Sequence, residues 1–199
     1  QSPDFTNASR SITDDLLRAI EDNDAVAVDI GALKISDEYT FKHSVDVATM
    51  SMIVARKYGL DDKQVYEIGI AGLLHDIGKI GIDEKILNKP GKLTKEEFEI
   101  MKTHTLIGAQ MLDNLDMYRN EKLLKLAYEI CRWHHERYDG KGYPDGLVGE
   151  EIPISAQVVS LADVYDALVS ERVYKKAFSH EKALEMIQNG ECGTFNPLL

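Results

Sequence analysis

Five histidines and two aspartates carry the chemistry that this sequence suggests. Each of them lies on or directly after a segment rich in apolar residues, where a helix would bury it. Buried imidazoles need hydrogen-bond partners, and a buried carboxylate without a partner is costly. One shared metal site would satisfy all seven side chains together. The residues are His43, His75, Asp76, His104, His134, His135 and Asp163.

Apolar spacing places two of these histidines on the inner face of a helix. His104 follows Met101 by three positions and precedes Gly108 by four, and His134 stands four positions after Ile130. Residues three or four apart share one helix face. A single histidine of this kind is usually an ordinary core residue with a hydrogen bond. Because the five histidines and two aspartates fall on five separate segments, we favour the shared metal site.

Two pairs of adjacent residues indicate two ions rather than one. Neighbours in a helix diverge by about 100°, so His134 and His135 converge only if the end of the helix frays or the metal lies beyond its terminus. Asp76 directly follows His75, and its two carboxylate oxygens could bridge two ions. A mixed set of imidazoles and carboxylates suits iron, manganese, nickel or zinc and does not choose among them.

The elements that must position these residues are helices. Helical periodicity dominates, no alternating strand pattern competes, and we predict an all-α bundle of seven to nine helices. Asp61 with Gln64 predicts the start of a helix that continues to Gly78, and Thr94 predicts the start of another that carries His104.

Further signals delimit the remaining segments. The pattern predicts a helix from about Tyr39 to a C-cap at Gly59 and a helix whose first residue is Pro153. Two long loops are expected, at 82–93 and 139–150, and ordered loops of that length tend to be functional.

Composition excludes some partners. The net charge of -11 disfavours polyanionic partners such as nucleic acids and anionic membranes. No apolar run is long enough to span a bilayer, and no signal peptide is found. The two cysteines, Cys131 and Cys192, form no CxxC motif, so we expect free thiols in a reducing, cytoplasmic setting.

The chain divides into two predicted regions. Residues 1–36 form an N-terminal helical extension or linker, with weak helices near 12–22 and 25–34, and residues 37–199 form the main domain. The sequence begins with Gln1 and ends at "FNPLL". We therefore expect a fragment of a longer protein, truncated at its C-terminus.

Two motifs resemble those of a known family. "HDIGK" at 75–79 and "HHERYDGKGYPDGL" at 134–147 are similar to the HD-GYP subgroup of the HD-domain metal-dependent phosphohydrolases. The resemblance covers about residues 39–197. It continues through "DEYTFKHS", "KPGKLTKEEFEIMKTHTLIGAQML" and "LADVYDALVSERVYKKAFS".

The resemblance implies a bacterial enzyme that hydrolyses cyclic di-GMP to linear pGpG, with the further cleavage to GMP left open. It would use two divalent metal ions, with iron or manganese favoured over nickel or zinc. The seven residues above would be the metal ligands, with Asp76 also catalytic. Lys79 would contact the scissile phosphate, and Arg172 and Lys175 would hold phosphate or guanine edges. The loop that carries Tyr143 would form a wall of the active site and dock partners.

Several residues keep two interpretations. Asp166 could orient a water or protonate the leaving group, or it could hydrogen-bond a ligand histidine. Tyr143 could stack on guanine or simply pack on the core. Glu136 and Arg137 are interpreted as an orienting pair, and His180 as a capping or solvent-facing residue outside the site.

The sequence departs from the family pattern at three places. Tyr39 stands where some members have a glutamate that adds a third metal, so two metals are expected. Gln157 replaces a common arginine, and "SERVYKK" lacks a proline. Substrate choice therefore stays open to another cyclic dinucleotide, such as cyclic GMP-AMP, or to a nucleotide. Two non-enzymatic hypotheses also stay open. In one, the domain is a catalytically silent module that binds metal and nucleotide and docks on a diguanylate cyclase; in the other, the metals only stabilise the core.

Overall fold

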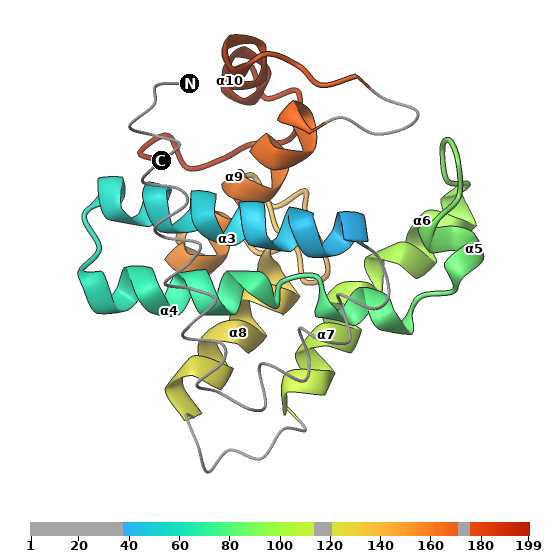
Figure 1. Ribbon diagram of the computed structural model, residues 1–199, viewed down its shortest axis with the longest axis horizontal. Helices are drawn as coiled ribbons and strands as arrows, with labels where there is room; N and C mark the ends of the chain where they lie inside the picture. Colours follow the sequence, from blue (N-terminus) through green and yellow to red (C-terminus); the bar gives the residue numbers. More distant parts are fainter. Residues whose placement is uncertain (1–37, 114–120, 171–175) are drawn as a thin grey trace.

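The computed structural model of the chain describes residues 38–113, 121–170 and 176–199, where helices are joined by loops (Figure 1). The α-helices are α3 (Glu38–Tyr58), α4 (Asp62–Leu73), α5 (Glu84–Leu87), α6 (Lys95–Lys102), α7 (His104–Asp113), α8 (Glu121–Trp133), α9 (Ile154–Val169) and α10 (His180–Gln188). Two 3-10 helices, η1 (Ile77–Gly81) and η2 (Gly149–Glu151), join them. No strand occurs in these ranges, which confirms the all-α prediction. The helices expected near 12–22 and 25–34 lie outside the described residues.

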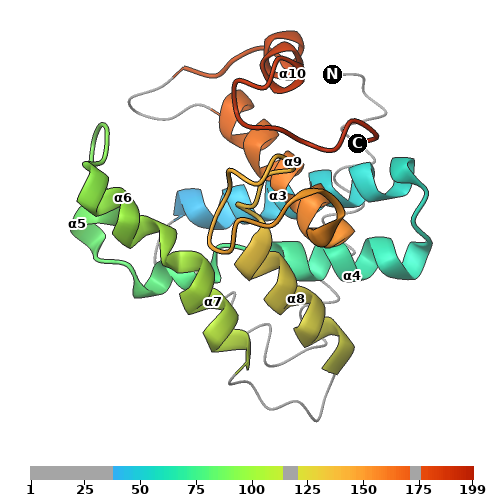
Figure 2. The same ribbon diagram turned by 180° about the vertical axis from the view of Figure 1, so that it is seen from behind.

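Helices that are distant in the sequence pack side by side. α3 lies against α4 and α9, α4 also contacts α8, and α7 packs on α8 and η1 (Figures 1 and 2). Segments from the first and last thirds of the chain therefore meet in the middle of the bundle. Among the described residues, no helix combines the length and the hydropathy that crossing a bilayer requires.

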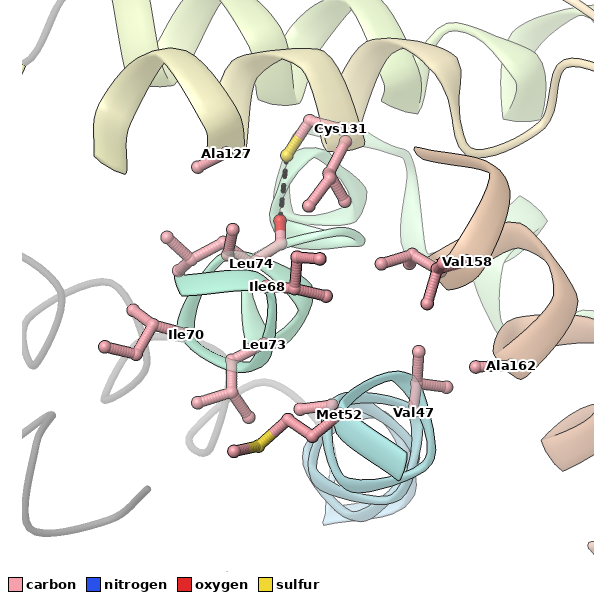
Figure 3. Packing of buried hydrophobic residues seen from close by; sticks show 14 of the residues in the cluster. Val47, Met52, Ile68, Ile70, Leu73, Leu74, Ala127, Cys131, Val158 and Ala162 are labelled. Atoms are coloured by element: carbon pink, nitrogen blue, oxygen red, sulfur yellow. Dashed lines mark hydrogen bonds between the residues drawn. The ribbon is translucent and has the colours of Figure 1, made fainter. Parts of the chain in front are cut away.

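The apolar core lies where α3, α4, α8 and α9 meet. Figure 3 shows Val47 of α3, Leu73 of α4 and Val158 of α9 within this cluster. Cys131 of α8 donates a hydrogen bond from Sγ to the Leu74 carbonyl at 2.9 Å, which ties α8 to the end of α4. Both cysteines are free thiols, as predicted. Each fully buried leucine stabilises such a core by about 1.5–3 kcal/mol.

The predicted start of α4 and the end of α3 are confirmed. The Asp61 side chain accepts the Gln64 N–H at 2.8 Å, and the Gln64 side chain accepts the Asp61 N–H at 3.1 Å. Gly59 adopts a φ of 108°, a left-handed conformation that favours glycine at a helix C-terminus.

The prediction that this helix continues to Gly78 is wrong. α4 ends at Leu73, so His75 and Asp76 lie in the turn before η1. In a continuing helix, the Gly72 carbonyl would accept the N–H of Asp76. It instead accepts from the main-chain N–H of His75 at 3.2 Å and from the Nδ1 atom of its ring at 2.7 Å. The imidazole thus helps to end the helix.

Three other predicted boundaries are corrected. The helix that begins after Thr94 is interrupted at Thr103, whose main-chain N–H and hydroxyl both bond to the Ile100 carbonyl and tighten the turn. The expected loop at 82–93 contains the short helix α5. Pro153 is the N-cap of α9 rather than its first residue.

Candidate metal centre

The structure brings the seven predicted ligand residues together in two adjoining groups. One group is Asp76, His104, His134 and His135, and the other is His43, His75, Asp76 and Asp163. Within each group, one nitrogen or oxygen atom of every residue lies within 4.8 Å of those of the others. Asp76 belongs to both groups. Each group could hold a metal ion.

Three segments meet the cluster at a helix terminus. His75 follows α4, His104 is the first residue of α7, and His134 follows α8. Because α8 ends at Trp133, the rings of His134 and His135 escape helical spacing and lie with their centroids 4.2 Å apart. The adjacent histidines can therefore serve one group, as the prediction required.

The two oxygens of Asp76 face different groups. Oδ1 lies 3.3 Å from Nε2 of His104 and 3.3 Å from Nε2 of His134. Oδ2 lies 3.1 Å from Nε2 of His75 and 3.1 Å from Nζ of Lys79. This is the arrangement of a carboxylate that can bridge two cations.

The main chain orients three of the histidines. Nδ1 of His75, His104 and His134 lies 2.7, 2.7 and 2.9 Å from a carbonyl oxygen three or four residues earlier. A carbonyl only accepts hydrogen bonds, so Nδ1 carries the proton and Nε2 is directed at the cluster. Within the described chain, these three Nε2 atoms and Oδ1 of Asp76 are buried without a hydrogen-bond partner. One cation in each group would satisfy these atoms, His75 in one and His104, His134 and Oδ1 of Asp76 in the other, so the residues fit a metal centre.

Carboxylates dominate the electrostatics of the His43 group. Burial alone lowers the pKa of His43, but hydrogen bonds to Asp163 and Asp166 outweigh it and raise the pKa to about 9. Burial likewise opposes the charge on His75, whereas Asp76 and Asp163 raise its pKa to about 10. Despite burial, the histidines hold the pKa of both aspartates well below the usual range. This group attracts positive charge, as a proton or as a metal ion.

Metal binding is therefore expected to release protons. In protein stripped of metal by a chelator, His43 and His75 are protonated at pH 7, since their pKa values of about 9 and about 10 lie above it. Ligation requires the neutral rings, so binding at pH 7 should release roughly two protons and tighten as the pH rises toward 10. Calorimetry in buffers of different ionisation enthalpy measures this number. No proton release at pH 7 would contradict the expectation.

The same shifts set the sign of the stability change. Both pKa values are raised above the unfolded value near 6.5. Protonation of the two rings thus stabilises the stripped protein fully below pH 6.5, and this contribution is lost as the pH rises through 9 to 10.

Asp166 contacts a ligand candidate rather than the middle of the cluster. Its Oδ2 lies 2.6 Å from Nδ1 of His43, while Nε2 of His43 lies 2.8 Å from Oδ1 of Asp163. Of its two predicted roles, the observed contact is the hydrogen bond to a histidine. A carboxylate in this position fixes the ring orientation and increases its basicity.

The cluster is partly exposed at Asp163, His135 and Lys79, and these residues define its open side. Asp163 was predicted to be buried, and its side chain is 14% exposed, more than that of Asp76 at 2%. His135 is half-buried, and Lys79 is 25% exposed while its ammonium contacts Asp76. Substrate could approach along this side.

The other predicted site residues fall differently. Tyr143 stacks on the ring of His135, with centroids 4.9 Å apart and 15° between the planes. His180 is exposed and hydrogen-bonds the Tyr165 hydroxyl at 2.5 Å, outside the cluster as expected. Arg172 and Lys175 lie outside the described residues.

Comparison with known proteins identifies the family. A family model described as HD domain matches residues 28–197, most of the chain. The chain belongs to the HD domain family. The HDIGK and GYP motifs place it with the HD-GYP members of this family, and the all-helical structure agrees.

Several relatives of the HD domain are named phosphodiesterases. A cyclic di-GMP phosphodiesterase of Pseudomonas aeruginosa is 41% identical over 197 residues, which cover 99% of this chain and 46% of the relative. A cyclic di-GMP phosphodiesterase of Thermotoga maritima is 46% identical over 161 residues, which cover 81% of this chain and 43% of the relative. The 3′3′-cGAMP-specific phosphodiesterase 2 of Vibrio cholerae is 37% identical over 168 residues, which cover 84% of this chain and 31% of the relative. The chain thus spans less than half the length of these relatives.

A solved structure shares the fold. Bd1817, a HDG"Y"P protein from Bdellovibrio bacteriovorus, superposes with a TM-score of 0.64. The match covers 96% of this chain and 67% of Bd1817 at 20% identity. At that identity the likeness concerns the fold alone.

The GYP loop of this HD domain is fastened to the ligand segment by Glu136. Its buried carboxylate accepts the backbone N–H groups of residues 145–147 at 2.7, 3.1 and 3.0 Å. Gly142 lies so close that a Cβ there would be 2.4 Å from the His135 carbonyl oxygen. These contacts hold Tyr143 over His135.

Glu136 and Arg137 are not an orienting pair, which corrects the prediction. Glu136 holds the loop, whereas Arg137 donates to the Ser160 hydroxyl at 2.9 Å and lies over the Phe195 ring at 5.2 Å. Gln157, the departure from the family arginine, bonds Asn196 at 3.1 Å.

Sequence reasoning missed two residues beside the HD domain's cluster. Phe98 on α6 lies edge-to-face with Tyr143, with ring centroids 6.1 Å apart. The Lys102 ammonium lies 5.4 Å from the Phe98 centroid and 5.6 Å from that of Tyr143. The i, i+4 spacing of an aromatic and a cation in a polar helix was the available signal.

Proposed function

We propose that this HD domain is a cyclic di-GMP phosphodiesterase that uses two divalent metal ions and forms linear pGpG, with GMP as the product of a second cleavage. The observation that carries the proposal is the carboxylate of Asp76, which turns one oxygen to each ligand group. The names of the relatives from Pseudomonas aeruginosa and Thermotoga maritima support the substrate.

The proposed metals are iron or manganese, followed by nickel or zinc, which accept the same ligand chemistry. When bound, such a pair of cations supplies a nucleophilic water and polarises a phosphodiester oxygen. We propose two ions because Tyr39 replaces the family's additional glutamate. The proposed ligands are His43, His75, Asp76, His104, His134, His135 and Asp163.

The chain's own residues bind and orient the phosphate in this proposal. Lys79 places its ammonium beside Asp76 on the open side of the cluster, where it would contact a non-bridging oxygen. Arg172 and Lys175 are proposed to hold phosphate or guanine edges, because a guanidinium gives two-point contact and an ammonium a point charge. Positive charge concentrated here lets a chain of net charge -11 bind an anion.

Cyclic GMP-AMP is a second candidate substrate. A relative named for 3′3′-cGAMP covers 84% of this chain, and both dinucleotides present the same phosphodiester to the cluster. A silent module that docks on a diguanylate cyclase is disfavoured, since no predicted ligand position has been lost.

One assay tests the proposal. The protein is loaded with iron or manganese under reducing conditions, its metal content is measured, and it is incubated with cyclic di-GMP and cyclic GMP-AMP. We expect linear pGpG by chromatography. Metal-loaded protein that hydrolyses neither dinucleotide would overturn the enzymatic proposal in favour of the binding module.

Two histidine substitutions should distinguish a metal ligand from a surface residue. His104→Ala removes an Nε2 atom 3.3 Å from Asp76 and should reduce hydrolysis by more than about 100-fold. His180→Ala, at an exposed position, should leave the rate unchanged. Steady-state rates of both variants at matched metal content provide the measurement. Equal effects would refute the assignment of the cluster.

Substitution of Asp166 distinguishes its two roles. Asp166→Ala removes the acceptor for Nδ1 of His43, so metal affinity should fall about 10- to 100-fold. Asp166→Asn should lose less, because its amide oxygen still accepts from Nδ1. Titration against a competing chelator measures both. Unchanged metal affinity with a reduced kcat would instead indicate action on the leaving group.

A further inference from the structure

Aromatic rings extend outward from the open side of the cluster. Tyr143 stacks on His135, and Phe98 stands edge-to-face against Tyr143 at an interplanar angle of 84°. Phe98 is 45% exposed. The row thus begins at a proposed metal ligand and ends at an exposed phenyl ring.

The two aromatic side chains differ in what they offer to a ligand. Tyr143 is half-buried, with one ring face against His135 and the Lys102 ammonium 5.6 Å from its centroid. Phe98 has the greater free surface. Tyr143 was one candidate for stacking on guanine. Phe98, which is the next ring in the row, is the stronger candidate.

Phe98 is held in place by its helix. The Thr94 side chain accepts the Glu97 N–H at 3.1 Å, and the Glu97 side chain accepts the Thr94 N–H at 2.9 Å. Lys89 on the preceding segment pairs with Glu97 at 2.5 Å. Lys102 is fixed by Glu99 at 2.7 Å and lies beside both rings. An anchored, exposed ring gives a stacking surface without the entropy cost of ordering it.

We infer that Phe98 is a substrate-binding residue that stacks on a purine base of the dinucleotide, while Lys102 holds Phe98 and Tyr143 in their edge-to-face arrangement. The inference rests on the proposed function. With a phosphate at the cluster, the attached nucleoside extends outward, and the row of rings borders that path. Every base has a π-face, so stacking selects dinucleotides as a class and does not discriminate guanine from adenine.

Kinetics of matched variants test the inference. Phe98→Ala should raise KM for cyclic di-GMP and for cyclic GMP-AMP about tenfold, within the range of one lost base stack, with kcat within about threefold. Phe98→Tyr keeps the ring and should retain the wild-type KM. Ile100→Ala is the control, since Ile100 is equally exposed at 45% on the opposite side of the same helix. Equal KM values for Phe98→Ala and Ile100→Ala would overturn the inference.

A binding measurement separates this inference from the proposed function. A cyclic dinucleotide with 2-aminopurine in place of one guanine loses fluorescence when the base stacks. Rapid mixing with metal-loaded wild type should quench it before turnover, and Phe98→Ala should abolish the quenching. Quenching without hydrolysis would support stacking on Phe98 and refute the proposed phosphodiesterase activity. Hydrolysis with equal quenching in wild type and Phe98→Ala would refute the inference and retain the enzyme.

Discussion

Asp76→Ala should remove both metal ions and all measurable hydrolysis while the helices remain folded. Asp76 is the one residue that belongs to both ligand groups, and each of its oxygens faces a different set of histidines. Loss of a ligand shared by two cations leaves each group without its central anion. The apolar core beneath the turn keeps its contacts, so circular dichroism should change little.

Asp163→Ala is the matched control, because Asp163 belongs to a single group. We expect metal analysis to give two ions per chain for the wild type, one for Asp163→Ala and none for Asp76→Ala. Inductively coupled plasma mass spectrometry after gel filtration provides the count. Two ions retained in Asp76→Ala would show that the carboxylate does not bridge.

Gly78→Ala should destabilise the fold and the cluster together. A Cβ at this position would lie 1.9 Å from the His104 carbonyl oxygen and 2.5 Å from the Gly108 nitrogen. Both are backbone atoms of α7, so relief requires η1 and α7 to separate. We expect a loss of at least about 3 kcal/mol, the upper range of overpacking costs. The melting temperature should then fall by about 6–12 °C.

The separation would also displace His104 from Asp76, so metal affinity should fall with stability. Gly72→Ala is the control, since its added Cβ would meet nothing closer than 3.6 Å. Alanine there should be neutral or stabilising by up to about 1 kcal/mol, because it favours the helix. Thermal unfolding with and without metal measures both variants. Similar melting temperatures for the two would contradict the predicted collision.

The convergence of the ligand candidates could be predicted because it depends on periodicity. The spacing of apolar residues placed His104 and His134 toward the core, and both are buried, although each lies at a helix terminus rather than within a helix. A capping box such as Asp61 with Gln64 is equally local, and it formed as expected. The fold class and the membership of the cluster therefore followed from short-range patterns.

The remaining features depend on contacts that sequence periodicity does not contain. α4 ends at Leu73, where the His75 ring donates a hydrogen bond to the Gly72 carbonyl in place of a helical N–H. The spacing of apolar residues does not predict this hydrogen bond. The predicted pairing of Glu136 is wrong because the N–H groups that it accepts lie in the loop, nine to eleven residues further on. Phe98 was missed because its neighbour Tyr143 lies on a distant segment.

The hydrogen bonds that Glu136 accepts tie the length of the GYP loop to the geometry of the candidate metal centre. Three N–H groups of residues 145–147 converge on one carboxylate that directly follows His135. Inserting or deleting a single residue between 137 and 144 would shift those donors out of register and move Tyr143 from its ring contact. Exchange of an exposed side chain such as Lys141 leaves the donors in place. The exposed positions of this stretch can therefore vary in sequence, whereas its length cannot vary.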